Sequence, residues 1–148
     1  MRDYSISNID INRYYQDDVE YGGCYSKDEL RRVRPGGKYY IINMEDSNVG
    51  EGSHWVLVYD CSPDETLYFD SYGISPPMEI RRFMRRTGKP GVYSDAQYQT
   101  LRSSKCGLYC IYIIDKLQSG ESIRDIVDHD LQETNLAHNE RVVASIKV

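Results

Sequence analysis

Cys106 and His54 are the residues of this 148-residue chain whose types and placement best suit nucleophilic chemistry. Cys106 closes a polar stretch, and a nearly continuous apolar run begins two residues later at Leu108. This pattern predicts that Cys106 lies in the first turn of a buried helix over 106–117. The unpaired amides and the dipole of a helix N-terminus favour a thiolate, so a cysteine placed there is readily activated.

A cysteine nucleophile also needs a general base, usually a histidine, and a third group that orients this base. The chain has three histidines, of which His129 and His138 lie in polar stretches and are most simply surface residues. His54 stands where a polar loop enters an apolar run, a place where functional side chains are often mounted. The alternative for His54 is a structural histidine whose hydrogen bonds are satisfied.

Two apolar runs at 55–59 and 66–70 predict the strands of a hairpin, because a short turn-forming stretch separates them. Symmetric pairing of these strands places His54 opposite Ser71 and beside Asp70. Residues that are opposite or adjacent in this way lie within about 5–8 Å of each other. Asp70 is therefore predicted to reach His54.

The same geometry excludes Asp60 as the partner of His54. Asp60 lies six residues further along the strand, which is roughly 20 Å at strand rise. The chain order His54, Asp70, Cys106 then supplies a base, an orienting carboxylate and a nucleophile. The predicted contact between Asp70 and His54 depends on the pairing register, because a slip of one residue changes the face that each side chain takes.

The rest of the chain is predicted to form helices and strands without repeats or low-complexity segments. Ser7 or Asn8 can cap a short amphipathic helix within 5–19, and Gly22-Gly23 is expected to break the chain. Further helices are predicted over 27–32, about 77–87 and about 134–146, and another is predicted to begin at Ser122. A buried strand is predicted at 38–44, a polar loop over 45–53 and a short edge strand within 92–99. This order predicts an α+β fold in one domain that spans 1–148.

The composition is that of a soluble globular protein, with 40% hydrophobic and 28% charged residues. No apolar run reaches membrane-spanning length, and the first residues lack the apolar core of a signal peptide. The formal net charge of −5 argues against nucleic acid as the main ligand. Basic clusters at 31–34 and 81–86 are expected to be solvated faces.

The four cysteines are Cys24, Cys61, Cys106 and Cys110, and none of them form a CxxC pair. Zinc is therefore not expected, and no other cofactor is implied. Without a signal peptide the compartment is expected to be reducing, so disulfides are not expected. Cys24 and Cys61 are expected to be structural thiols, and Cys110, one helical turn beyond Cys106, to pack in the core.

Four short blocks occur in a specific order within about 25–115: His54-Trp55 at a strand start, Phe69-Asp70-Ser71-Tyr72-Gly73, Gln99 seven residues before Cys106, and Cys106-Gly107-Leu108-Tyr109-Cys110. Together they resemble the adenovirus-type cysteine proteases (adenain), with the SUMO-specific proteases as more distant kin. The compact length and the stretch Gly52-Ser53-His54-Trp55-Val56 are similar to the maturation proteases of virophages and polinton-like elements. The resemblance implies a mixed central sheet packed against the helix that starts at the catalytic cysteine.

The resemblance also implies a role for each matched residue. Cys106 would be the nucleophile, His54 would deprotonate it and later protonate the leaving amine, and Asp70 would orient His54. The adenovirus enzymes carry glutamate at the place of Asp70, whereas the SUMO proteases carry aspartate. Gln99 would donate its amide to the oxyanion together with the Cys106 backbone N–H, a donor typically worth about 3 kcal/mol of barrier. Gln97 competes for this role, although its separation of nine residues from Cys106 fits less well.

Trp55 would bind substrate, because in the resembled family the tryptophan after the histidine forms one wall of a narrow channel that admits glycine.

The expected function is that of a cysteine endopeptidase that cleaves capsid or other virion precursor proteins after Gly-containing motifs. An isopeptidase that removes ubiquitin-like modifiers is the enzymatic alternative, and a non-catalytic binding module on the same fold is the alternative of another class. The expected locations are the virion and the cytoplasm of the infected cell, and the expected state is a monomer.

The sequence departs from the adenovirus pattern in what would activate the enzyme. Adenovirus protease is switched on by a disulfide-linked peptide and by DNA. The matching region of this chain, around 85–95, has no cysteine, and the chain is acidic overall. Neither a disulfide-linked activator, nor DNA activation, nor a membrane partner is expected.

Overall fold

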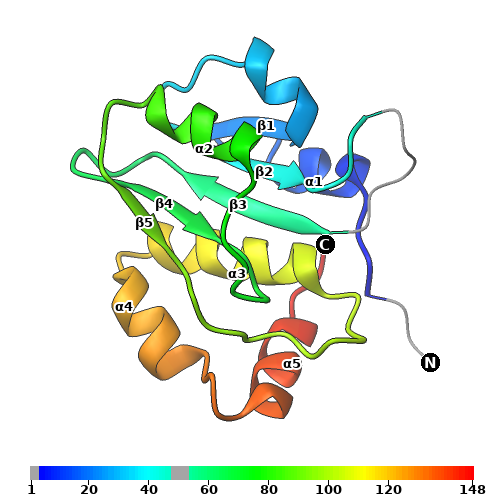
Figure 1. Ribbon diagram of the computed structural model, residues 1–148. Coiled ribbons are helices and arrows are strands. Elements are labelled where there is room, and N and C mark those ends of the chain that lie inside the picture. Colours follow the sequence, from blue (N-terminus) through cyan, green and yellow to red (C-terminus); the bar gives the residue numbers. More distant parts are fainter. Residues whose placement is uncertain (1–3, 48–53) are drawn as a thin grey trace.

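A five-stranded mixed sheet forms the centre of the computed structural model, which describes residues 4–47 and 54–148. Its strands follow the chain order from edge to edge (Figure 1), and they are β1 (Tyr21–Ser26), β2 (Tyr39–Asn43), β3 (Trp55–Tyr59), β4 (Thr66–Phe69) and β5 (Gly91–Tyr93). Strands β2, β3 and β4 pair antiparallel, and the edge strands β1 and β5 pair parallel with their neighbours. The predicted α+β class with a mixed sheet is confirmed.

Helices cover both faces of this sheet (Figure 1). They are α1 (Asn8–Tyr14), the 3-10 helix η1 (Lys27–Arg32), α2 (Met78–Arg85), α3 (Cys106–Gln118), α4 (Ile123–Asp125), the π-helical turn η2 (Ile126–Asp130) and α5 (Leu136–Ala144). The buried helix α3 packs with Ile41, Leu57 and Phe69 on one face. On the other face α2 and η1 pack over Val56, Val58 and Tyr68.

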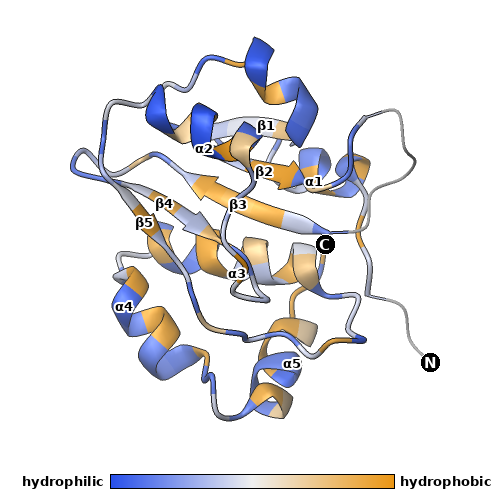
Figure 2. Ribbon diagram, viewed as in Figure 1, coloured by the Kyte–Doolittle hydropathy of each residue, from blue (hydrophilic) through white to orange (hydrophobic). Residues whose placement is uncertain are grey.

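The hydropathy pattern follows this layering. Figure 2 shows orange, apolar ribbon along β2, β3 and much of α3, whereas blue segments dominate η1 and α2. All five residues of β2 are buried, and the four before Asn43 form an apolar run without alternation. Among the described residues no helix is both long enough and apolar enough to cross a membrane.

The helix starts follow the predicted caps. Ser7 caps α1 with a reciprocal capping box that involves Asp10. Ser26 opens η1 with a capping box to Glu29, although this helix is of the 3-10 type. Ser122 caps α4, which gives way after three residues to the π-helical turn. The predicted edge strand within 92–99 corresponds to the short strand β5 at Gly91–Tyr93. Residues 48–53 of the predicted loop at 45–53 lie outside the described residues.

The predicted break at Gly22-Gly23 is wrong, because these residues belong to strand β1. The pairing with β2 shifts between Tyr21 and Gly23, and Gly23 has a positive φ of 123°. A β-carbon on Gly22 would come within 2.3 Å of the Tyr40 ring. The two glycines therefore let an irregular edge strand lie against a large aromatic side chain.

The predicted hairpin of β3 and β4 is present, but its register differs by one residue from symmetric pairing. Leu57 pairs with Phe69 and Tyr59 with Leu67. Across the turn, Asp60 accepts a hydrogen bond of 3.1 Å from the Thr66 hydroxyl. Asp60 thus belongs to the opposite end of the strand from His54.

Candidate active site

Cys106 is the first residue of α3, at the N-terminal end of a helix that is buried over most of its length. Its side chain is 8% exposed, and its Sγ accepts a hydrogen bond of 3.4 Å from the backbone N–H of Trp55. No side chain caps this helix, so its first amides remain available to stabilise negative charge. The predicted placement of Cys106 at a helix start is confirmed.

Asp70 holds His54 from the end of the neighbouring strand. His54 Nε2 lies 2.8 Å from Asp70 Oδ1, and the Asp70 side chain is 1% exposed. The same carboxylate oxygen accepts the backbone N–H of Tyr72 at 2.8 Å, and the Ser94 hydroxyl accepts the Asp70 N–H at 3.0 Å. These hydrogen bonds hold the Asp70 carboxylate in place independently of its contact with the His54 ring.

The observed register explains how these two side chains meet. Continued past the paired residues, it sets position 54 opposite Tyr72 and position 70 opposite Val56. His54 and Asp70 are then diagonal neighbours on one face, a relation that the symmetric register did not give. The rings of His54 and Tyr72 also lie in contact, with centroids 4.9 Å apart.

Burial and its two neighbours act in opposite directions on the pKa of His54. Burial alone would lower this pKa, but the hydrogen bond with Asp70 and the proximity of Cys106 outweigh it and raise the pKa to about 9. Nδ1, on the far side of the ring from Asp70, is buried and makes no hydrogen bond to any described residue. His54 is consequently charged at neutral pH, with Cys106 close by.

The two ring nitrogens of His54 have different roles in this arrangement. An ionised carboxylate only accepts hydrogen bonds, so Nε2 must donate its hydrogen to Asp70. Nδ1 is then the nitrogen that can exchange a proton with Cys106. Such a pair of thiolate and imidazolium can attack a carbonyl carbon and afterwards protonate a leaving group.

Gln99 is fully buried and ties together two loops of the site. Its Oε1 accepts the Ser71 hydroxyl at 2.5 Å, and its Nε2 donates to the Ser103 carbonyl at 2.8 Å. Ser71 follows Asp70, and Ser103 lies just before Cys106, so Gln99 positions both sides of the site. The half-buried Gln97 donates to the Gln99 carbonyl at 2.9 Å. The oxyanion role of Gln99 stays a prediction, because its amide is buried here and bonded to the Ser103 carbonyl.

Trp55 is 7% exposed and lies under the segment 4–7. Its indole N–H donates to the Ile6 carbonyl at 3.1 Å. A β-carbon on Gly107 would come within 2.5 Å of the Ile6 side chain and 3.3 Å of the indole. The structure is thus tightly packed beside Cys106, and the substrate-binding role of Trp55 stays a prediction.

The other three cysteines have environments that keep them protonated. Burial raises the pKa of Cys24 and of Cys61 to about 12, with further contributions from Glu29 and Glu20 respectively. The pKa of Cys110 is raised well above its usual value, again mainly by burial. Among the described cysteines, only Cys106 lies beside a charged histidine.

Several supporting residues were not found from the sequence. Glu140 of α5 accepts hydrogen bonds from Tyr109 at 2.5 Å and Thr100 at 3.2 Å, which anchors α5 to the first turn of α3 and to the loop before Cys106. Ser94 and Ile6 also contact the site, and no local motif marks any of these residues. His129 is exposed and His138 bonds to the Asp130 carbonyl, so neither joins the site.

Comparisons with known proteins point to viral proteases, although no protein-family model matches the chain. A cysteine protease of African swine fever virus is 24% identical over 154 aligned positions, which cover 90% of this chain and 55% of that protein. A protein of Acanthamoeba polyphaga mimivirus that bears the name of a thiol protease is 33% identical over 137 positions, covering 83% of this chain and 45% of that protein.

The crystal structure of a protease of African swine fever virus superposes with a TM-score of 0.60 at 15% identity, covering 93% of this chain and 64% of that one. The chain has the fold of a viral cysteine protease. It spans about half the length of the curated relatives it matches. The similarity therefore gives the fold and the general class of its relatives, which are named cysteine or thiol proteases.

Proposed function

We propose that this chain is a cysteine endopeptidase that cleaves precursor proteins of a virion during maturation. The observation that carries the proposal is the pair of His54 and Asp70 beside Cys106 at the start of α3. A buried carboxylate that orients a charged histidine next to a helix-terminal thiol has no evident purpose in a binding module. The viral origin of the relatives supports a role in virus assembly.

The proposed reaction uses these side chains in two steps. The Cys106 thiolate attacks the carbonyl carbon of the scissile peptide, and the C–N bond breaks as His54 Nδ1 gives its proton to the leaving amine. A thioester then links the substrate acyl group to Sγ. A water molecule, deprotonated by the now neutral His54, attacks this thioester and releases the acid and the thiolate.

We also propose that the enzyme prefers glycine next to the scissile bond. The support is the position of Trp55, whose backbone N–H donates to the Cys106 Sγ and whose indole lies 3.3 Å from a β-carbon built on the next residue, Gly107. A substrate side chain directed at this indole would clash with it, whereas glycine would not. This part of the proposal retains the expected role of Trp55 as a wall of the substrate channel.

An isopeptidase acting on ubiquitin-like modifiers is the second candidate. Another African swine fever virus relative, 26% identical over 132 positions that cover 75% of this chain and 47% of that protein, bears the name SUMO-1 cysteine protease. Ubiquitin-like modifiers end in two glycines, so both candidate functions involve the same preference for glycine at the scissile bond.

We also propose that the enzyme acts as a monomer in the infected cell and in the virion, and that its free cysteines stay reduced there.

A peptide panel tests the proposed preference. Substrates that differ only at the residue before the scissile bond, as glycine, alanine or leucine, are compared by kcat/KM. We expect glycine to exceed leucine by at least about 100-fold, because the bulky side chain meets Trp55. Equal turnover of glycine and leucine peptides would remove the preference.

The two candidate functions are separated by their natural substrates. The chain and its Cys106→Ala form are each incubated with capsid precursors and with a ubiquitin-like fusion. We expect cleavage of the precursors, at glycine-containing sites, by the unaltered chain alone. Cleavage of the fusion only would favour the isopeptidase, and cleavage by the alanine form would contradict both.

A further inference from the structure

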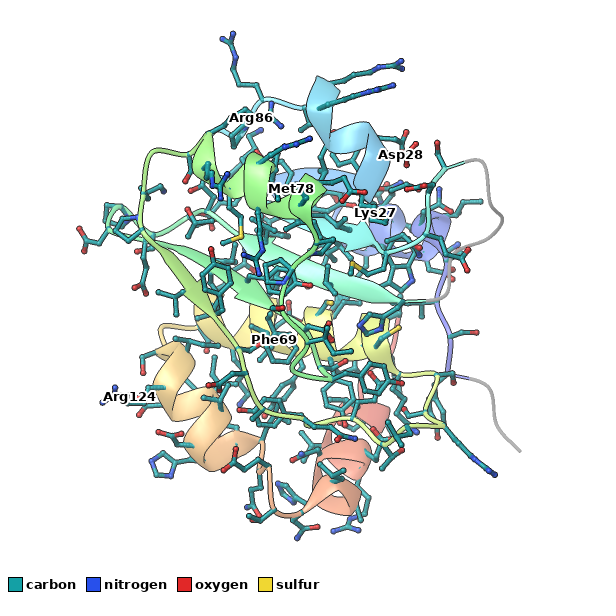
Figure 3. The ribbon with its side chains drawn as sticks, viewed as in Figure 1. Lys27, Asp28, Phe69, Met78, Arg86 and Arg124 are labelled. Carbon is teal, nitrogen blue, oxygen red and sulfur yellow. The ribbon has the colours of Figure 1, made fainter. Side chains whose placement is uncertain are left out.

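A basic groove runs between η1 and α2, on the face of the sheet opposite α3. It has a volume of about 520 Å³ and is lined by five cations and two carboxylates, a formal charge of +3. The chain as a whole carries −5. Figure 3 shows Lys27 and Asp28 on η1 and Arg86 at the C-terminal end of α2. The groove thus joins one arginine of the cluster at 31–34 with three of the cluster at 81–86.

Arg86 fixes the shape of this groove. Its guanidinium donates to the Leu30 carbonyl at 2.6 Å and to the Val33 carbonyl at 2.9 Å. The same group lies over the Phe83 ring, 5.3 Å from its centroid. These contacts tie the C-terminal end of η1 to α2, so the groove exists before any partner binds.

The carboxylates in the groove already have partners. Lys27 Nζ lies 2.9 Å from Glu79 and 2.6 Å from Asp46. Asp28 accepts the N–H and the hydroxyl of Ser47 at 2.8 and 2.7 Å. Glu79 is therefore paired with Lys27, whereas neutral donors hold Asp28 in place and leave its charge, which the sum of +3 already includes.

Three arginines of the groove are available to a partner. Arg31 of η1 and Arg82 and Arg85 of α2 are exposed, and their side chains make no hydrogen bond or salt bridge to another described residue. Arg82 and Arg85 are three residues apart on one helix, so their side chains emerge from neighbouring turns. Guanidinium groups bind carboxylates in a bidentate geometry, which gives direction as well as charge complementarity.

We propose that this groove binds an acidic linear segment of the polypeptide substrate, a proposal that rests on the protease function inferred above. The basic surface is short, because the eight residues of α2 span only about 12 Å. This length suits a few consecutive acidic residues better than a nucleic acid held along several phosphates. The net negative charge of the remaining surface also disfavours an extended polyanion.

The Lys27 end of the groove is connected to the active site. Asp46, which Lys27 binds, lies just after β2, and the nearby Met44 N–H donates to the His54 carbonyl at 2.9 Å. An acidic segment in the groove would thus leave it at the end of the sheet where His54 lies. A substrate would then present its docking segment and its scissile bond to two separate sites joined by a spacer.

Binding is tested with the Cys106→Ala protein, so that no cleavage interferes. The probes are a fluorescent 12-residue peptide with six glutamates, the same peptide with glutamines, and duplex DNA of equal length in residues. The triple variant R31E/R82E/R85E is compared with R124E/R141E/K147E, which makes the same charge change at exposed positions elsewhere. We expect the Kd of the glutamate peptide to be at least about tenfold higher for the groove variant than for the parent. For the control variant the Kd should stay within about twofold of the parent's value. Added salt should weaken binding to the parent.

Turnover is tested with two substrates that share one cleavage site and differ in an added acidic segment. In the groove variant we expect KM to rise for the acidic substrate alone, while kcat stays unchanged. Absence of peptide binding, equal loss in the control variant, or tighter binding of duplex DNA through the same arginines would overturn the proposal. Peptide binding without any turnover would instead refute the protease function and leave the groove as an acidic-peptide site.

Discussion

Replacing Cys106 by alanine is expected to lower kcat/KM by at least about 10⁴-fold, because none of the other three thiols lies beside His54 to form the thioester. The loss should appear in kcat, since the peptide can still bind. Cys110→Ala is the matched control, because Cys110 lies one turn further along the same helix and is buried in the core. It should keep most of the activity. Steady-state kinetics on a glycine-containing peptide measure both.

The fold of the Cys106→Ala protein should be intact, because the substitution removes one sulfur atom at the edge of the core. Its unfolding temperature should stay within a few degrees of the parent, as judged by circular dichroism. Activity that survives in a folded Cys106→Ala protein would contradict the assignment of the nucleophile. Equal loss in Cys110→Ala would indicate that helix packing, not nucleophilic chemistry, explains the result.

Replacing Asp70 by asparagine is expected to lower kcat/KM by about 10²- to 10⁴-fold, because the histidine loses its orienting anion. The pH profile should change as well. The folded pKa of His54, about 9, lies above the ordinary value of 6.5, so the imidazolium persists until the pH rises through 9. Without the Asp70 charge this pKa falls, and the alkaline limb of activity should move to lower pH.

The same shift predicts how stability depends on pH. The pairing of charged His54 contributes fully below pH 6.5 and is lost as the pH rises through about 9. In Asp70→Asn this decline should be weaker and should occur at lower pH, as thermal unfolding between pH 6 and 10 would show.

Asp60→Asn is the control for Asp70→Asn, because Asp60 is also buried and lies at the far end of the same hairpin. It binds Lys89 at 2.6 Å, so its replacement should reduce stability. The alkaline limb of its activity should stay in place. An unmoved limb in Asp70→Asn, or an equal movement in Asp60→Asn, would show that Asp70 does not set the charge of His54.

The sequence predicted the helix of Cys106 and the hairpin of His54 because both depend on local signals. A polar stretch followed by an apolar run marks a buried helix start, and two apolar runs around a turn mark a hairpin. The register was missed, since it depends on contacts such as that between Asp60 and Thr66. Asp70 was nevertheless identified, because a one-residue change leaves it within reach of His54.

Other features could not be predicted because they depend on contacts between distant segments. Strand β1 contains two glycines, whose place in a sheet is explained by the Tyr40 ring beside Gly22 and by the positive φ of Gly23. The cover that Ile6 forms over Trp55 joins residues 49 positions apart. The two basic clusters were expected to be separate solvated faces, and the contact of Arg86 with η1 brings them together.

Covalent trapping tests the central claim most directly. A peptide that ends in glycine and carries a vinyl sulfone in place of the scissile bond is incubated with the protein, and the adduct is mapped by mass spectrometry. We predict one adduct, on Cys106 and not on Cys24, Cys61 or Cys110, whose formation slows by at least about 100-fold in His54→Ala. An adduct on another cysteine, or an equal rate in His54→Ala, would contradict the assignment of Cys106 and His54 as the reacting pair.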